Sequence, residues 1–170
     1  METTSLKLYS LGYDQAKTYG IAALFAAGNI VLPQLVHLLP QGGFIWLPIY
    51  FFTLVAAYKY GWKAGLLTAL LSPLCNAWLF GMPAPAMLPV ILVKSVLLAV
   101  AAGYAAARWN RAALWMLAAV VAAYQVAGSL FEWAWTGSAA AALQDVRLGL
   151  PGMLLQVSGG WLLINKLIRK

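Results

Sequence analysis

A few polar side chains lie inside long apolar stretches, and their types suit the binding of a small polar molecule. The set contains an ammonium, a carboxylate and several carboxamides, at Gln34, Asn76, Lys94, Gln125, Glu132 and Gln156. Charged groups can pair with a ligand, and carboxamides can donate hydrogen bonds to ring heteroatoms and accept bonds from them. Gln125 and Glu132 are seven residues apart, which puts them on one face of a helix. Because polar groups are costly in lipid, those that occur there are usually functional or paired.

Each of these side chains also has a plainer interpretation. The long stem of Lys94 could carry its ammonium to the membrane surface. Glu132 could lie at the interface, or the two residues could form the structural ion pair that a dry interior requires. Asn76 and Gln156 could join neighbouring helices by hydrogen bonds.

The residues that catalysis usually needs are scarce. The chain has one histidine, His37, one cysteine, Cys75, and four carboxylates, and it has no nucleophile elbow, phosphate-binding glycine loop or CxxC pair. A lone cysteine also rules out an internal disulfide. We expect His37 to be a solvated loop residue and Cys75 to pack as a small apolar side chain. The sequence therefore predicts a protein that is not an enzyme and that needs no metal or cofactor.

The elements that must position the polar residues are six apolar stretches. Hydrophobic residues make up 64% of the 170-residue chain and charged residues only 9%, against about 25% charged in a soluble domain. We place the spans roughly at 18–39, 45–60, 62–80, 87–108, 112–134 and 149–167, with Gly- and Pro-containing connections between them. The sequence predicts an all-α membrane protein, a six-transmembrane-helix bundle forming a single integral membrane domain over residues 1–170.

The basic residues indicate how this bundle lies in the bilayer. Nearly all of them fall before the first span, in the second and fourth loops or at the C-terminus, whereas the other loops hold only Arg147. The positive-inside rule then puts both termini in the cytoplasm. The net charge of +7 consists of single residues at helix ends, which indicates topology signals and contact with lipid, with no nucleic acid as partner. The polar N-terminus lacks the features of a cleaved signal peptide, so we expect the first span to be retained.

In this topology the polar side chains share one depth. All of them fall in the outward halves of their predicted spans, while the inward halves hold mainly Ala, Leu, Val and Gly; the set is Gln34, His37, Asn76, Lys94, Gln125, Glu132 and Gln156. We therefore predict a polar cavity that opens to the outside.

Small residues recur at four-residue spacing on several predicted helices. The first span carries Ala22, Ala23, Ala26 and Ala27, and the fourth carries Ala99 and Gly103. Such faces let helices approach closely in lipid. They could serve packing within the bundle, or they could form a docking surface for another membrane protein.

The middle of the chain resembles a known family. Residues 61–104, GWKAGLLTALLSPLCNAWLFGMPAPAMLPVILVKSVLLAVAAGY, look like the centre of the substrate-binding S component of an energy-coupling factor (ECF) vitamin transporter. The resemblance rests on a glycine-started third helix, a Pro-rich third loop and the fourth helix. As architecture it extends over most of the chain.

The resemblance implies a multi-pass protein of the bacterial cytoplasmic (inner) membrane that binds a vitamin or related micronutrient. It implies that Ala22, Ala23, Ala26 and Ala27 dock on an ECF transmembrane coupling subunit, which works with ATPases. Members of the family bind thiamin, riboflavin, biotin, folate, pantothenate, pyridoxine or cobalamin. A cysteine near the outer end of the third helix ligates cobalt in some cobalamin-binding members, which makes Cys75 a minority candidate for that role. Aromatic residues near the expected cavity mouth suit a flat ring: Phe44, Trp46, Tyr50, Trp78, Phe80 and Trp133.

Two other classes compete with this interpretation. A small membrane scaffold or assembly protein would need no polar cavity, and its polar groups would point at neighbouring helices. An intramembrane enzyme is disfavoured by the missing catalytic residues.

Overall fold

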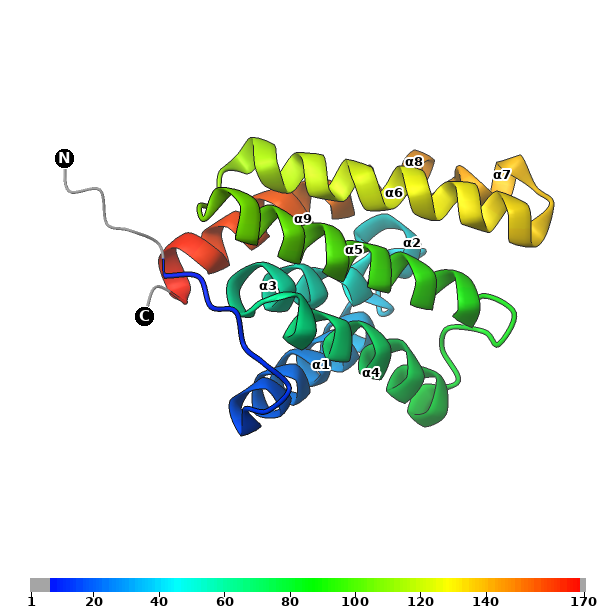
Figure 1. Ribbon diagram of the computed structural model, residues 1–170. Helices are drawn as coiled ribbons and strands as arrows, with labels where there is room; N and C mark the ends of the chain where they lie inside the picture. Colours follow the sequence, from blue (N-terminus) through cyan, green and yellow to red (C-terminus); the bar gives the residue numbers. More distant parts are fainter. Residues whose placement is uncertain (1–6, 169–170) are drawn as a thin grey trace.

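A computed structural model describes residues 7–168, and every regular element within that range is helical. The long helices are α1 (Ala16–Val36), α4 (Trp62–Phe80), α5 (Leu88–Trp109) and α6 (Leu114–Thr136). The shorter elements are α2 (Gly42–Trp46), η1 (Pro48–Tyr50), α3 (Phe51–Tyr60), α7 (Ala139–Ala142), α8 (Gln144–Leu148), α9 (Leu150–Leu162) and the π-helical turn η2 (Leu163–Leu167). They form one bundle with the long helices side by side (Figure 1).

Four of the helices, α1, α4, α5 and α6, are long and apolar enough to cross a membrane. They correspond to the first, third, fourth and fifth predicted spans. Helix α4 has the predicted limits because a glycine with positive φ stands at each end, Gly61 at φ 101° and Gly81 at φ 66°. Glycine has no Cβ, so it can adopt this geometry and end a helix there without steric cost.

The second predicted span, 45–60, is divided in the structure. Helix α2 ends at Trp46, Leu47 takes the left-handed conformation at φ 45°, and α3 begins only at Phe51. With ten residues, α3 is about 15 Å long, half the thickness of the hydrocarbon core. The sixth predicted span corresponds to the 13 residues of α9, which continue without a break into the 5 residues of η2. The predicted loop between the last two spans contains the short helices α7 and α8.

Helix α3 lies in the interior of the bundle. All of its residues except Phe52 are buried, against α1, α4, α5 and α9. Close approach depends on glycine, because a Cβ on Gly65 of α4 would stand 2.3 Å from the Cβ of Ala57. The short helix is thus shielded by its neighbours.

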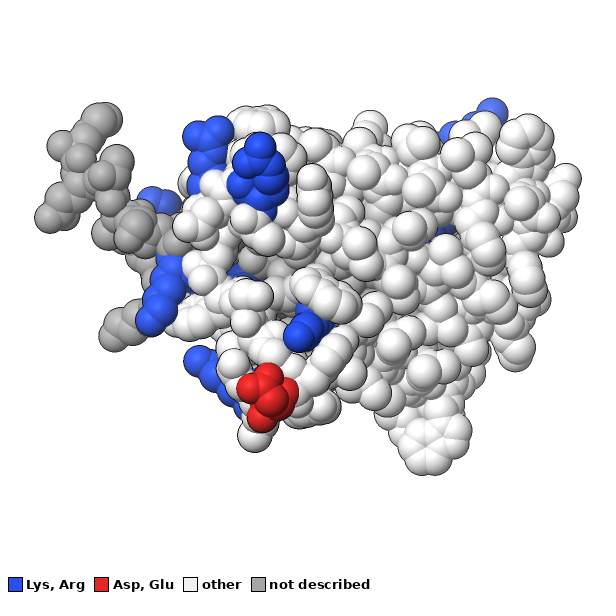
Figure 2. Space-filling model, in the orientation of Figure 1, with Lys and Arg blue, Asp and Glu red and all other residues white. Residues whose placement is uncertain are grey.

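The described ends of the chain lie at the same end of the bundle (Figure 1). The N-terminal segment is held there by backbone hydrogen bonds, from Tyr9 N to Lys59 O at 2.8 Å and from Leu11 N to Tyr60 O at 3.1 Å. Three lysine ammonium groups surround the ring of Tyr9, with those of Lys7 and Lys17 at 5.3 and 4.9 Å from its centroid and that of Lys59 at 5.8 Å. Figure 2 shows Lys and Arg side chains gathered at this end.

Candidate functional site

A cavity of about 390 Å³ lies at the end of the bundle opposite to the described chain ends. Its walls come from the C-terminal end of α1, from α2 and η1, from the ends of α4 and α6, from the start of α5 and from α8. The volume falls in the range of small-molecule sites. Most of the wall is apolar, with a small set of polar side chains: Gln34, His37, Gln41, Tyr50, Asn76, Lys94, Glu132, Gln144 and Asp145.

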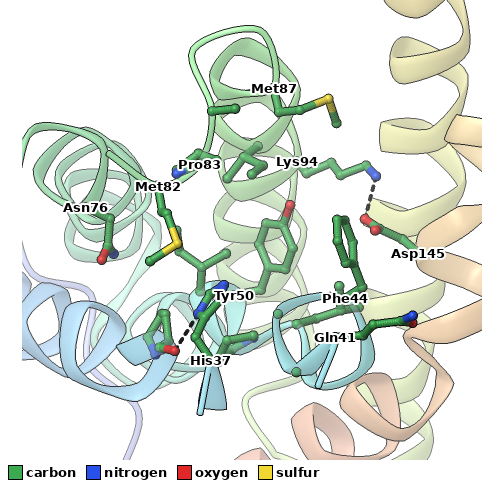
Figure 3. A pocket seen from close by; sticks show the side chains of 18 of the residues that line it. His37, Gln41, Phe44, Tyr50, Asn76, Met82, Pro83, Met87, Lys94 and Asp145 are labelled. Atoms are coloured by element: carbon green, nitrogen blue, oxygen red, sulfur yellow. Dashed lines mark hydrogen bonds and ion pairs between the residues drawn. The ribbon is translucent and has the colours of Figure 1, made fainter. Parts of the chain in front are cut away.

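The strongest polar feature is an ion triad at one side of this cavity. The Nζ of Lys94 lies 2.6 Å from Glu132 Oε2 and 2.7 Å from Asp145 Oδ2. The side chain of Lys94 is only 1% exposed, those of Glu132 and Asp145 are 5% and 16% exposed, and Figure 3 shows the bond to Asp145. Lys94 therefore does not extend to the membrane surface; it bridges two carboxylates from different elements.

The sequence makes room for this lysine with a glycine. A Cβ on Gly128 of α6 would stand 2.4 Å from Lys94 Cγ, and the Cδ and Cε atoms would be within 3.2 Å. The absence of a side chain at Gly128 lets the lysine stem pass close to α6. The ammonium then reaches Glu132, one helical turn further along the same helix.

Across the cavity, Asn76 is buried and held by helices α1 and α4. Its Nδ2 donates to Asn29 O at 3.0 Å and to Ser72 O at 3.1 Å, and its Oδ1 accepts from Gln34 Nε2 at 3.4 Å. Gln34 and Asn76 are thus bonded to each other where both line the cavity.

Asn29, which the sequence analysis did not single out, links three helices at mid-bundle. Its Nδ2 donates to Thr53 Oγ1 at 2.9 Å and Ser72 Oγ at 3.1 Å, and its Oδ1 accepts from Phe52 N at 3.0 Å. The signal that marked the other carboxamides, a polar side chain at membrane depth, applied to Asn29 as well. This network makes α1, α3 and α4 a rigid support for one wall of the cavity.

Gln125 and Gln156 are buried but lie outside the cavity wall. The Oε1 of Gln156 accepts a hydrogen bond from Tyr124 Oη at 3.0 Å, and the Tyr124 ring lies 5.4 Å from that of Tyr50. Within residues 7–168, neither side-chain polar atom of Gln125 has a partner, nor does Nε2 of Gln156. Both glutamines therefore lie one layer behind the cavity, at mid-bundle.

The predicted aromatic wall is present only in part. Phe44 and Tyr50 line the cavity, whereas Trp46, Trp78, Phe80 and Trp133 do not. Trp78 is 84% exposed, because Asn76 faces inward and a residue two positions later points to the other side of a helix. Trp46 is only partly buried, and its backbone carbonyl packs against Gly152 of α9. These two tryptophans thus stand outside the cavity to which the sequence analysis assigned them.

Asp145 is the site residue that sequence reasoning missed. It belongs to α8, in a stretch predicted to be an external loop, where an acidic residue carries no signal. Only the fold brings α8 over the cavity and places its carboxylate on Lys94.

The structure places His37 and Cys75 in different surroundings. His37 lines the cavity, with its Nδ1 2.6 Å from Pro33 O, and Cys75 is partly buried outside the cavity wall. Across residues 7–168, no group of three His, Cys, Asp or Glu side chains could hold a metal ion.

The four alanines of α1 divide into two faces. Ala22 and Ala26 are buried against the bundle, while Ala23 and Ala27 are exposed on its outer surface. The outer face also carries exposed apolar side chains, including Leu24, Val31 and Leu35.

Comparisons of the chain with protein-family models, with curated proteins and with solved structures found no match. The fold and site define an all-helical protein with four helices of membrane-spanning length and a cavity that contains a buried ion triad.

Proposed function

We propose that this protein is the high-affinity substrate-binding subunit for uptake of a vitamin or related micronutrient, acting without catalysis. It would work with an ECF transmembrane coupling subunit and ATPases in the bacterial cytoplasmic membrane. The observation that carries the proposal is the buried triad of Lys94, Glu132 and Asp145 in the wall of a 390 Å³ cavity. Burying three charges is costly, and a scaffold protein has no need of such a site beside an open cavity.

The cavity opens to the outside in this proposal. The end of the bundle with Lys17, Lys59, Lys63, Arg108 and Arg111 would face the cytoplasm by the positive-inside rule. The cavity lies at the other end. The segment 42–60 would be the second crossing, shielded by its neighbours, and α9 with η2 would be the sixth, about 27 Å long. Both termini would then be cytoplasmic.

Cysteine labelling tests this topology. In a Cys75→Ser background, a cysteine at Ser138 should react with a membrane-impermeant maleimide in intact cells. A cysteine at Ser10 should react only after permeabilisation, because it lies at the basic end. Labelling of both positions from the same side contradicts the six-span arrangement.

The outer face of α1 is the proposed docking surface for the coupling subunit. Ala27→Leu should lower uptake at least tenfold and leave ligand affinity unchanged, because a bulky side chain on an exposed small-residue face blocks helix approach. Uptake into cells that express the coupling module measures the first quantity, and calorimetry on the purified subunit measures the second.

Ala26→Leu is the matched control for this substitution. Ala26 is buried, so the added atoms should lower the thermal stability of the bundle itself. If Ala27→Leu also destabilises the subunit and weakens ligand binding, the exposed face belongs to internal packing and the docking proposal fails.

A further inference from the structure

We propose that the ligand of this cavity carries one positive charge, on an amine or a protonated nitrogen heterocycle, and that Glu132 and Asp145 hold it. The inference rests on the proposed binding function and names its substrate class.

The charges in the cavity wall do not balance. The wall contains one lysine, Lys94, and two carboxylates, Glu132 and Asp145, so its Lys, Asp and Glu side chains together carry one excess negative charge. Lys94 already donates two of its three N–H groups to the carboxylates, at 2.6 and 2.7 Å, so its single positive charge is matched by theirs. A buried charge without a partner is costly, so the cavity favours an occupant that supplies one positive charge.

Two carboxylate oxygens in the cavity wall can still accept hydrogen bonds from a ligand that donates them. In the described part of the chain, Oε1 of Glu132 and Oδ1 of Asp145 accept no hydrogen bond, and each carboxylate uses only its other oxygen for Lys94. The hydroxyl of Tyr50, which can donate or accept a hydrogen bond, also points into the cavity (Figure 3). Charged N–H groups form strong hydrogen bonds with such carboxylate oxygens.

The remaining wall indicates an organic cation instead of a metal ion. The volume of about 390 Å³ holds a ring-sized molecule, and the two carboxylates lack the further ligands that a metal would need. Phe44 and Tyr50 supply ring faces on which a cationic or flat heterocycle can lie.

A vitamin panel sorted by charge tests the inference. Purified protein is titrated by calorimetry at pH 7 with thiamin and pyridoxamine, with uncharged pyridoxine and riboflavin, and with the anions biotin and pantothenate. We expect the binder to come from the first pair. Asp145→Asn should weaken it at least tenfold, since Lys94 keeps Glu132 as a partner and the fold stays intact.

Asp14→Asn is the matched control, because Asp14 is exposed before α1, far from the cavity wall, and should leave affinity unchanged. An anion that binds, and binds more tightly to Asp145→Asn, overturns the cation inference and leaves the proposed function standing. An uncharged compound that binds with equal affinity to the wild type and to Asp145→Asn also overturns the cation inference and leaves the proposed function standing. If no compound of any class binds, both proposals are contradicted.

Discussion

Replacing Lys94 with methionine is expected to lower the free energy of unfolding by about 3–5 kcal/mol, because it leaves buried charges without a partner. Glu132 and Asp145 would face each other in a buried site with their only shared cation removed. Methionine keeps the length and apolar character of the lysine stem beside Gly128, so the loss reports the charge and not the packing. Reversible unfolding in detergent, followed by circular dichroism, measures the change.

Two further variants test whether unpaired buried charge causes the loss of stability. Neutralising the whole triad with Lys94→Met, Glu132→Gln and Asp145→Asn together should recover most of the lost stability, since no charge is then left unpaired. Lys63→Met, at the basic end and only partly buried, should change stability by less than about 1 kcal/mol. A Lys94→Met protein as stable as the wild type would mean that the buried triad does not form.

Substituting Gly103 with leucine is expected to prevent α4 and α5 from packing. A Cβ at this position would stand 2.4 Å from Trp62 Cβ and 2.7 Å from Trp62 Cα. Because one of these atoms is backbone, the clash cannot be relieved by a rotamer change, and we expect a loss of about 3 kcal/mol or failure to fold. Thermal unfolding of the purified protein measures the effect.

Gly20→Leu is the matched control, because a Cβ on that helical glycine has nothing within 4 Å. It should leave the melting temperature near that of the wild type. Equal melting temperatures for the two variants would contradict the close approach of α4 to α5.

The sequence predicted the long helices well because their limits depend on local chemistry. Helix α4 begins after Gly61 and ends before Gly81, and these two glycines are visible in any sequence. The break at Leu47 is different, since hydropathy does not fall there; its local signal is Pro48, whose ring disfavours a helical conformation at the residue before it. Hydropathy alone therefore predicted one continuous span at 45–60.

The sequence predicted how far along each helix the polar side chains lie, but not which side of the helix they face. Asn76, Lys94 and Glu132 were found because polar groups at one depth in apolar helices are rare. Trp78 shares that end of α4 but faces away, and Gln125 lies about 10 Å from Glu132 along the axis of α6. Depth along a helix can be read from position in the chain, whereas the facing direction depends on which neighbours pack against it.

The charge balance of the cavity could not be obtained from the sequence. Lys94 and Glu132 predicted a balanced pair, and only the position of α8 adds the carboxylate of Asp145. In our proposal, this one residue of α8 makes a cation the expected ligand. Such a contact between distant segments has no local signature.

Ligand protection of a cysteine in the cavity wall tests the central claim most directly. Ala84 lines the cavity and is exposed, so a cysteine there, in a Cys75→Ser background, should react with an impermeant maleimide added outside intact cells. A mixture of vitamins should slow that reaction at least tenfold, while a cysteine at Ser138, outside the cavity wall, should react at the same rate with or without the mixture. Labelling of the Ala84 position only after permeabilisation, or at a rate that no vitamin changes, would contradict an outward-opening binding site.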